Sequence, residues 1–206
     1  MVGAGTLFSY LSAFVTIVLA LGLSDLLVSC HRLFRHARTI KWALLPLAAA
    51  LFVLLALFSE FFTMWSLTEV ERVSFGGLIL HMLPTIFIFL AASAVLPDEI
   101  DREGFDLGAF YLDQKLYFYV TLALAFVSDI PRWLLGTDAT LLDILHHLIS
   151  PTGLAAAIFI LLAFVRWRWV HWLGLAIVFG MVLWNFPQRL IEAPAAVESP
   201  AANASS

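Results

Sequence analysis

The stretch WALLPLAAALFVLLALFSEFFTMW, residues 42–65, decides the fold of this chain. It carries a tryptophan at each end and a single charged residue, Glu60, between them. A helix needs about 20 apolar residues to cross the roughly 30 Å of hydrocarbon in a bilayer. Tryptophan favours the headgroup level at both faces of the membrane. The stretch therefore predicts a helix that crosses a membrane.

Comparable apolar blocks fill most of the 206 residues, 62% of which are hydrophobic and 13% charged. We predict an all-α fold: a polytopic transmembrane bundle formed as a single domain by residues 1–191, with a disordered tail over 192–206. The predicted spans are 6–29, 42–66, 74–96, 115–135, 151–166 and 170–187. The fifth is short, and it can instead begin near Thr140, as an amphipathic helix over 140–150, and bend at Pro151.

Basic residues are divided unevenly between the predicted loops. The positive-inside rule places the richer side in the cytoplasm, so both termini are expected to face outward. In a bacterium this corresponds to a multi-pass protein of the inner membrane. The richer side holds Arg32, Arg35, Arg38, Lys41, Arg102, Lys115, Arg166 and Arg168, and the poorer side holds Arg72, Arg132 and Arg189.

Several classes of protein are excluded by composition. The net charge of −4 excludes a strongly basic surface for nucleic acid. The single cysteine, Cys30, excludes an internal disulfide and a CxxC redox pair. No motif specifies a reaction or a cofactor, and we therefore favour a function other than catalysis.

Ionisable residues inside the predicted spans are candidates for an ion or proton pathway, because a charge at membrane depth costs free energy. At about 1.5 Å per residue, Glu60, His81 and Asp129 each lie roughly 9–12 Å below the outer boundary. Arg132 follows Asp129 at a spacing of i, i+3, which permits an ion pair. Asp25 lies near the cytoplasmic end of the first span.

Two partners are conceivable for Asp25, namely Arg32 and Lys115. A different polar feature precedes the fifth span, where Asp143, His146, His147 and Ser150 form one stripe on a helix. This helix either lies flat in the outer interface or turns its stripe into the bundle. Carboxylates and imidazoles bind zinc and manganese. Asp143, His146 and His147 are therefore candidate metal ligands.

Close contacts between helices are expected where two small residues are separated by three others. Three such pairs occur in the predicted spans. They are Ser9 with Ala13, Ala20 with Ser24, and Ala176 with Gly180.

The segment from Leu83 to Phe118 contains Leu83-Pro84, Leu96-Pro97 before an acidic run, Asp106-Leu107 and Phe110-Tyr111. In these features it resembles an uncharacterised group of small six-helix bacterial inner-membrane proteins. The resemblance covers about a sixth of the chain. It implies a bacterial origin and six helices, and it brings no activity or site with it.

The function we favour is a channel or transporter for protons, cations or a small solute, with Glu60, His81, Asp129 and Arg132 lining an outward vestibule. In the alternative, these groups pair with one another and the protein is a scaffold or accessory subunit that binds partner helices, pigments or lipids. A membrane-embedded enzyme that uses the His/Asp cluster is a third possibility. The expected partners are membrane lipids and either further copies of the chain or a membrane complex.

Overall fold

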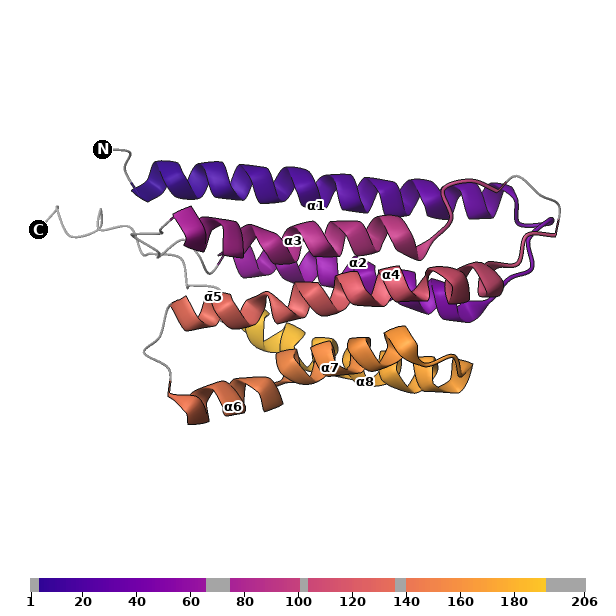
Figure 1. The fold of residues 1–206 in the computed structure, drawn as a ribbon. Coiled ribbons are helices and arrows are strands. Elements are labelled where there is room, and N and C mark those ends of the chain that lie inside the picture. The colour runs from indigo at the N-terminus through magenta and orange to yellow at the C-terminus, as the bar shows by residue number, and fades with distance from the viewer. Residues whose placement is uncertain (1–3, 66–74, 101–103, 136–139, 192–206) are drawn as a thin grey trace, which may run out of the picture.

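In the computed structural model, residues 4–65, 75–100, 104–135 and 140–191 are described, and the regular elements in these ranges are all α-helices (Figure 1). The prediction of an all-α chain is thereby confirmed. The predicted tail over 192–206 lies outside the described residues. The helices are α1 (Ala4–Arg35), α2 (Leu44–Trp65), α3 (Phe75–Val95), α4 (Leu107–Val127), α5 (Asp129–Leu135), α6 (Leu141–Ile149), α7 (Pro151–Phe164) and α8 (Arg168–Ile191).

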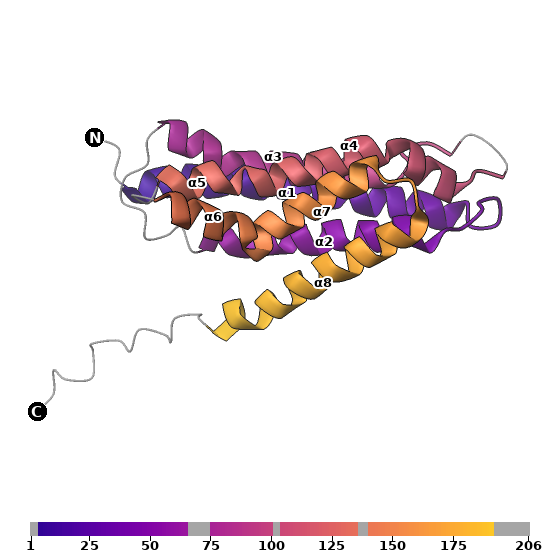
Figure 2. The ribbon, with the colours of Figure 1, turned by 60° about the horizontal axis from the view of Figure 1, so that its bottom comes forward.

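The helices lie along one long axis, and the chain runs back and forth between the two ends of the bundle (Figure 1). α5 continues the direction of α4, and α6 leads into α7. α4 packs against both α3 and α7, while α8 packs on α2 and α7. Figure 2 shows that α8 crosses the other helices at an angle. The segments that join α1 to α2, α3 to α4 and α7 to α8 meet at one end of the bundle.

Two helices extend beyond the predicted spans. The helix that contains the first span, 6–29, continues to Arg35, and Arg32 and Arg35 form part of its last turn. Basic side chains stabilise the negative end of the helix dipole, so these residues extend the helix rather than end it. α1 has 32 residues, which at 1.5 Å per residue makes it roughly 48 Å long.

The other is α4, which begins at Leu107, eight residues before the start of the predicted span 115–135. The cause is an N-cap. The carboxylate of Asp106 accepts a hydrogen bond from the backbone N–H of Ala109 at 2.9 Å. This hydrogen bond lowers the pKa of Asp106, and the positive charges of Lys41 and Arg168 add to the effect. The N-cap thus accounts for the first two turns of α4, residues 107–114, which precede the predicted span.

The predicted bend at Pro151 is confirmed. α6 and α7 meet at an angle of 61° across Ser150. Ser150 is the C-cap of α6, and its hydroxyl accepts from the N–H of Gly153 at the start of α7. α6 is the amphipathic helix expected over 140–150, and Thr140 and Asp143 form a capping box at its start.

Two helices in the described part of the chain are long and apolar enough to cross a membrane, α1 over Ser12–Arg35 and α2 over Leu44–Thr63. The bent pair of α6 and α7 adds a third if it is one broken span. Shorter apolar helices cover Ile79–Val95 and Arg168–Trp184. A few helices of this fold therefore have the length and composition of membrane spans.

The small-residue pairs predicted to join helices do not do so within the chain. Their described members, Ala13, Ala20, Ser24, Ala176 and Gly180, are all exposed, and the side chain of Ser9 lies outside the described part. The spacing of two small residues does not show which face of a helix is buried. That face is determined by the packing of the large apolar side chains. The close approaches occur instead at other glycines, such as Gly22 against Leu57 and Phe89, and Gly174 against Leu162.

Candidate functional site

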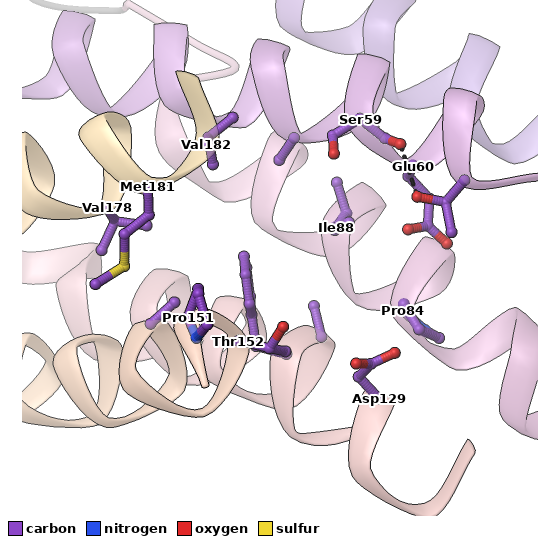
Figure 3. Close-up of a pocket in the computed structure, with 15 residues that line it drawn as sticks. Ser59, Glu60, Pro84, Ile88, Asp129, Pro151, Thr152, Val178, Met181 and Val182 are labelled. Atoms are coloured by element: carbon purple, nitrogen blue, oxygen red, sulfur yellow. Dashed lines mark hydrogen bonds between the residues drawn. The ribbon is translucent and has the colours of Figure 1, made fainter. Parts of the chain in front are cut away.

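A partly open pocket of about 170 Å³ lies inside the bundle (Figure 3). Helices that are far apart in the sequence contribute to its walls. α2 supplies Ser59, Glu60 and Thr63, and α3 supplies Pro84. The remaining polar lining comes from Asp129 at the start of α5 and Thr152 in the first turn of α7, and α8 adds Val178, Met181 and Val182.

Glu60 is 8% exposed and is the most deeply buried acidic residue in the described part of the chain. The hydroxyl of Thr85, which is fully buried on α3, donates a hydrogen bond of 3.1 Å to Oε1 of Glu60. Pro84 precedes Thr85 and also lines the pocket. Because proline has no N–H, α3 lacks one helical hydrogen bond at this level. The lining of the pocket thus combines an acid with an interrupted helix.

Asp129 reaches the same pocket from the first position of α5. Its Oδ2 lies 3.7 Å from Nε2 of His147 on α6. α6 therefore turns His147 toward the bundle, while Leu141, Leu142 and Ile149 point outward and are exposed. Of the predicted polar stripe, His147 alone is shown to face an acid of the bundle, whereas Asp143 and His146 are exposed. The choice between the two predicted arrangements of this helix therefore stays open.

The other pathway candidates are placed differently. His81 lies one turn before Thr85, and its Nδ1 donates to the carbonyl of Gly77 at 2.7 Å. It is not among the described residues that line the pocket. The side chain of Arg132 lies outside the described part, so its pairing with Asp129 stays a prediction. Of the residues predicted to share one cavity, Glu60 and Asp129 both line the pocket. The ring of His81 instead binds a carbonyl of its own helix.

Asp25 is partly buried on α1, and the charges that act on it are those of Asp98 and Arg32. The guanidinium of Arg32 donates to the backbone carbonyl of Asp98. Lys115, the other predicted partner of Asp25, is bound elsewhere. Asp25 thus belongs to the opposite end of the bundle from the pocket.

The three predicted metal ligands make different contacts and do not form one cluster. Asp143 accepts hydrogen bonds from the N–H and the hydroxyl of Thr140, at 2.9 and 2.6 Å, and so caps its own helix. His146 is exposed, and His147 faces Asp129. Within the described residues, no group of three His, Cys, Asp or Glu side chains could hold a metal ion. Binding of zinc at His146 and His147 stays a prediction.

On one side the pocket borders a packed aromatic layer. Phe126 lines the pocket, and its ring centroid lies 5.3 Å from that of Phe159. Phe159 in turn meets Phe52 edge to face at 5.5 Å, and Phe52 meets Phe179 at 5.6 Å. Both Phe52 and Phe159 are fully buried. These four rings close the bundle beside the pocket.

Beyond that layer lies a second buried polar cluster, formed by Tyr111, Tyr119 and His171. His171 and Tyr119 are 0% exposed. Nε2 of His171 donates to the carbonyl of Val165 at 3.0 Å, because a carbonyl oxygen can only accept. Nδ1 of the ring then accepts from Tyr111 at 3.0 Å, and the hydroxyl of Tyr119 lies 3.3 Å from the same nitrogen. The two tyrosine hydroxyls are hydrogen-bonded to each other.

Lys115 completes this cluster and holds the end of α7. Its ammonium donates to the carbonyls of Ala163 and Val165, both at 2.8 Å. The last carbonyls of a helix have no intrahelical partner and carry the negative end of its dipole, which a buried cation stabilises. Lys115 and His171 thus stabilise the turn between α7 and α8 through hydrogen bonds to its carbonyls.

This second cluster was missed by reasoning from the sequence. Tyr111, Lys115 and Tyr119 are spaced at i, i+4 and i+8, so they share one face of a helix. This spacing was present in the sequence, but the predicted span began at residue 115 and so left out Tyr111. No sequence pattern marks His171 as part of a polar cluster, since its neighbours include Trp167, Trp169 and Trp172.

Comparison with known proteins gives no relative: no protein-family model, no curated protein and no solved structure matches this chain. The resemblance to small bacterial inner-membrane proteins therefore stays a prediction.

Proposed function

We propose that the protein is a multi-pass membrane protein that carries a proton or small cation by means of the pocket between α2, α3, α5, α7 and α8. The observation that supports this function is the pair of carboxylates, Glu60 and Asp129, brought to one pocket from different helices. An acid held at membrane depth is costly and is characteristic of ion and proton pathways. The aromatic layer beside the pocket favours a carrier over an open pore.

The distribution of polarity supports a membrane setting. Polar residues such as Thr85, Lys115 and His171 are buried, while large apolar side chains cover the outside. Many exposed large apolar side chains are expected where a protein contacts lipid or other proteins. The exposed set on α1, α2, α7 and α8 includes Phe14, Ile17, Leu21, Leu51, Phe58, Ile160, Leu161, Phe164, Leu173, Ile177 and Leu183.

We further propose six crossings: α1, α2, α3, α4 with α5, α6 with α7, and α8. Supporting this count, Trp42, Trp167, Trp169 and Trp172 are exposed near the end of the bundle where three of the connecting segments meet. The described basic residues of the richer side lie at the same end. By the positive-inside rule this end faces the cytoplasm of a bacterial inner membrane, and both termini face outward.

The orientation predicts opposite labelling of two introduced cysteines. With Cys30 replaced by serine, Gly76→Cys at the start of α3 is expected to react with a membrane-impermeant maleimide in intact cells. Arg38→Cys in the α1–α2 connection is expected to react only after the cells are permeabilised. Both positions are exposed, and a Cβ at residue 76 meets no atom within 4 Å. Labelling of Arg38→Cys alone from outside would reverse the proposed orientation.

The carrier function predicts a specific loss in Glu60→Gln. The amide keeps the shape of the side chain and can still accept from Thr85, but it removes the charge. In proteoliposomes, uptake of protons, rubidium or methylammonium by the wild-type protein should exceed that of empty vesicles. The flux of the variant should be at least ~10-fold lower than that of the wild type. A tenfold change corresponds to the free energy of about one charge-assisted hydrogen bond.

The matched control is Glu99→Gln, which makes the same chemical change at an exposed acid on the α3–α4 connection. Its flux should equal that of the wild type. If all three probes fail to cross with the wild-type protein, or if both variants behave alike, the carrier function is wrong.

A scaffold that binds partner helices is the second candidate, and one observation favours it. Over residues 168–184 the outer face of α8 is exposed, and it carries Trp169, Trp172 and Trp184. A scaffold would present this face to another protein. It predicts no flux in the test above.

A further inference from the structure

The pocket has a polar side and an apolar side. Figure 3 shows Glu60 and Asp129 at one side, with Val178 and Met181 on α8 at the other. Thr152 lies between them with its hydroxyl in the pocket region. A ligand that fits this lining has a polar head and a short apolar tail.

The charge of the lining favours a cationic head. Both ionisable residues among the described lining residues are acids. Glu60 is the more buried of the two acids, being 8% exposed. Asp129 already lies 3.7 Å from the ring of His147. An ammonium group between them could donate to both carboxylates.

The size and the donor set argue against a bare metal ion as the ligand. Structural zinc takes four protein ligands and calcium takes six to eight oxygens. No group of three metal-ligating side chains exists among the described residues. The volume of about 170 Å³ is close to that of a cavity of ~150 Å³ that admits benzene, so it suits a molecule of roughly six non-hydrogen atoms.

We propose that this pocket binds a small primary alkylammonium, with the ammonium group against Glu60 and Asp129 and the alkyl chain against Val178, Met181 and Val182. This assignment rests on the proposed function and names its cargo. Phe126 also lines the pocket and adds to its apolar wall. The apolar side sets an upper limit to the chain length.

Equilibrium binding to the detergent-purified full chain tests the assignment without transport. Isothermal titration with methyl-, ethyl-, butyl- and hexylammonium should give an affinity that rises to butylammonium and falls at hexylammonium. Butanol, which lacks the charge, and rubidium, which lacks the tail, should bind at least ~10-fold more weakly. Equal affinity for rubidium and butylammonium, or no binding of any amine, would overturn the proposal.

Two variants locate the ligand in the pocket. Glu60→Gln should weaken butylammonium roughly 10–100-fold, Asp129→Asn should weaken it less, and Glu99→Gln should leave it unchanged. Met181→Ala enlarges the apolar side and should move the preferred chain length from butyl toward hexyl. This shift is a ratio of affinities in one protein, so it does not depend on the stability of the variant. An unchanged preference in Met181→Ala would contradict the placement of the tail.

Binding and flux can fail separately. Proton or rubidium flux that requires Glu60, together with no binding of amines, keeps the carrier function and removes the alkylammonium. Binding of amines that requires Glu60, with no flux of any probe, keeps the ligand and removes the carrier.

Discussion

Replacement of His171 by alanine is expected to lower the free energy of unfolding by about 3 kcal/mol. The substitution leaves the buried hydroxyl of Tyr111 without the ring nitrogen that accepts from it, and it removes one of the two donors to the carbonyl of Val165, the other being Lys115. It also leaves a cavity in a core where neighbouring rings are in contact, since Tyr111 and Tyr119 pack on the imidazole at 5.6 and 5.4 Å. Unfolding titrations in mixed micelles, followed by tryptophan fluorescence, give the measurement.

Two further variants separate the causes of this loss. His171→Phe leaves no cavity and removes the hydrogen bonds, so it should retain part of the destabilisation. His31→Ala removes an exposed histidine from α1 and should change the free energy of unfolding by less than about 0.5 kcal/mol. If His171→Ala were no more destabilising than His31→Ala, the cluster would not hold the turn between α7 and α8.

The helices themselves could be predicted because their apolar blocks are long and are bounded by tryptophan. The helices extend beyond the predicted spans where local hydrogen bonds and charges stabilise further turns. Asp106 starts α4 eight residues before the apolar block because its carboxylate caps the helix. Likewise, Arg32 and Arg35 continue α1 beyond its apolar part. Caps and helix dipoles act over a single turn, and an average over 20 residues does not detect them.

The pocket could be predicted in part, since depth along a helix is a property of the sequence. Glu60 and Asp129 share a depth, and the structure places both on one pocket. The direction of a side chain around the helix is decided by packing, and this is why His81, at a similar depth, turns to Gly77 instead. The contribution of α8 through Met181 could not be predicted, because α8 crosses the bundle at an angle that its sequence does not specify (Figure 2).

The wall of the pocket formed by α7 depends on one glycine. A Cβ added at Gly153 would lie 2.2 Å from the carbonyl oxygen of Leu148 and 2.9 Å from its Cα. These are backbone atoms of α6, and they cannot turn away as a side chain can. The 61° bend between α6 and α7 therefore requires a residue without a side chain at this position.

Gly153→Ala is accordingly expected to destabilise the protein by about 2–3 kcal/mol, as overpacking against a rigid neighbour does. Because α6 must move away from α7, the distance between Asp129 and His147 should increase, and the pocket beside Thr152 should widen. Spin labels on α5 and α6 would record the change in distance, and unfolding titrations would record the loss of stability.

Gly180→Ala is the matched control and should have the opposite effect. Gly180 lies within α8, and a Cβ there meets no atom within 4 Å. Alanine is favoured over glycine inside a helix by roughly 0.5–1 kcal/mol, so this variant should be slightly more stable than the wild type. The two substitutions make the same chemical change, and the clash with α6 is present only at Gly153. Equal stability of Gly153→Ala and Gly180→Ala would mean that α6 does not sit against α7 as the bend requires.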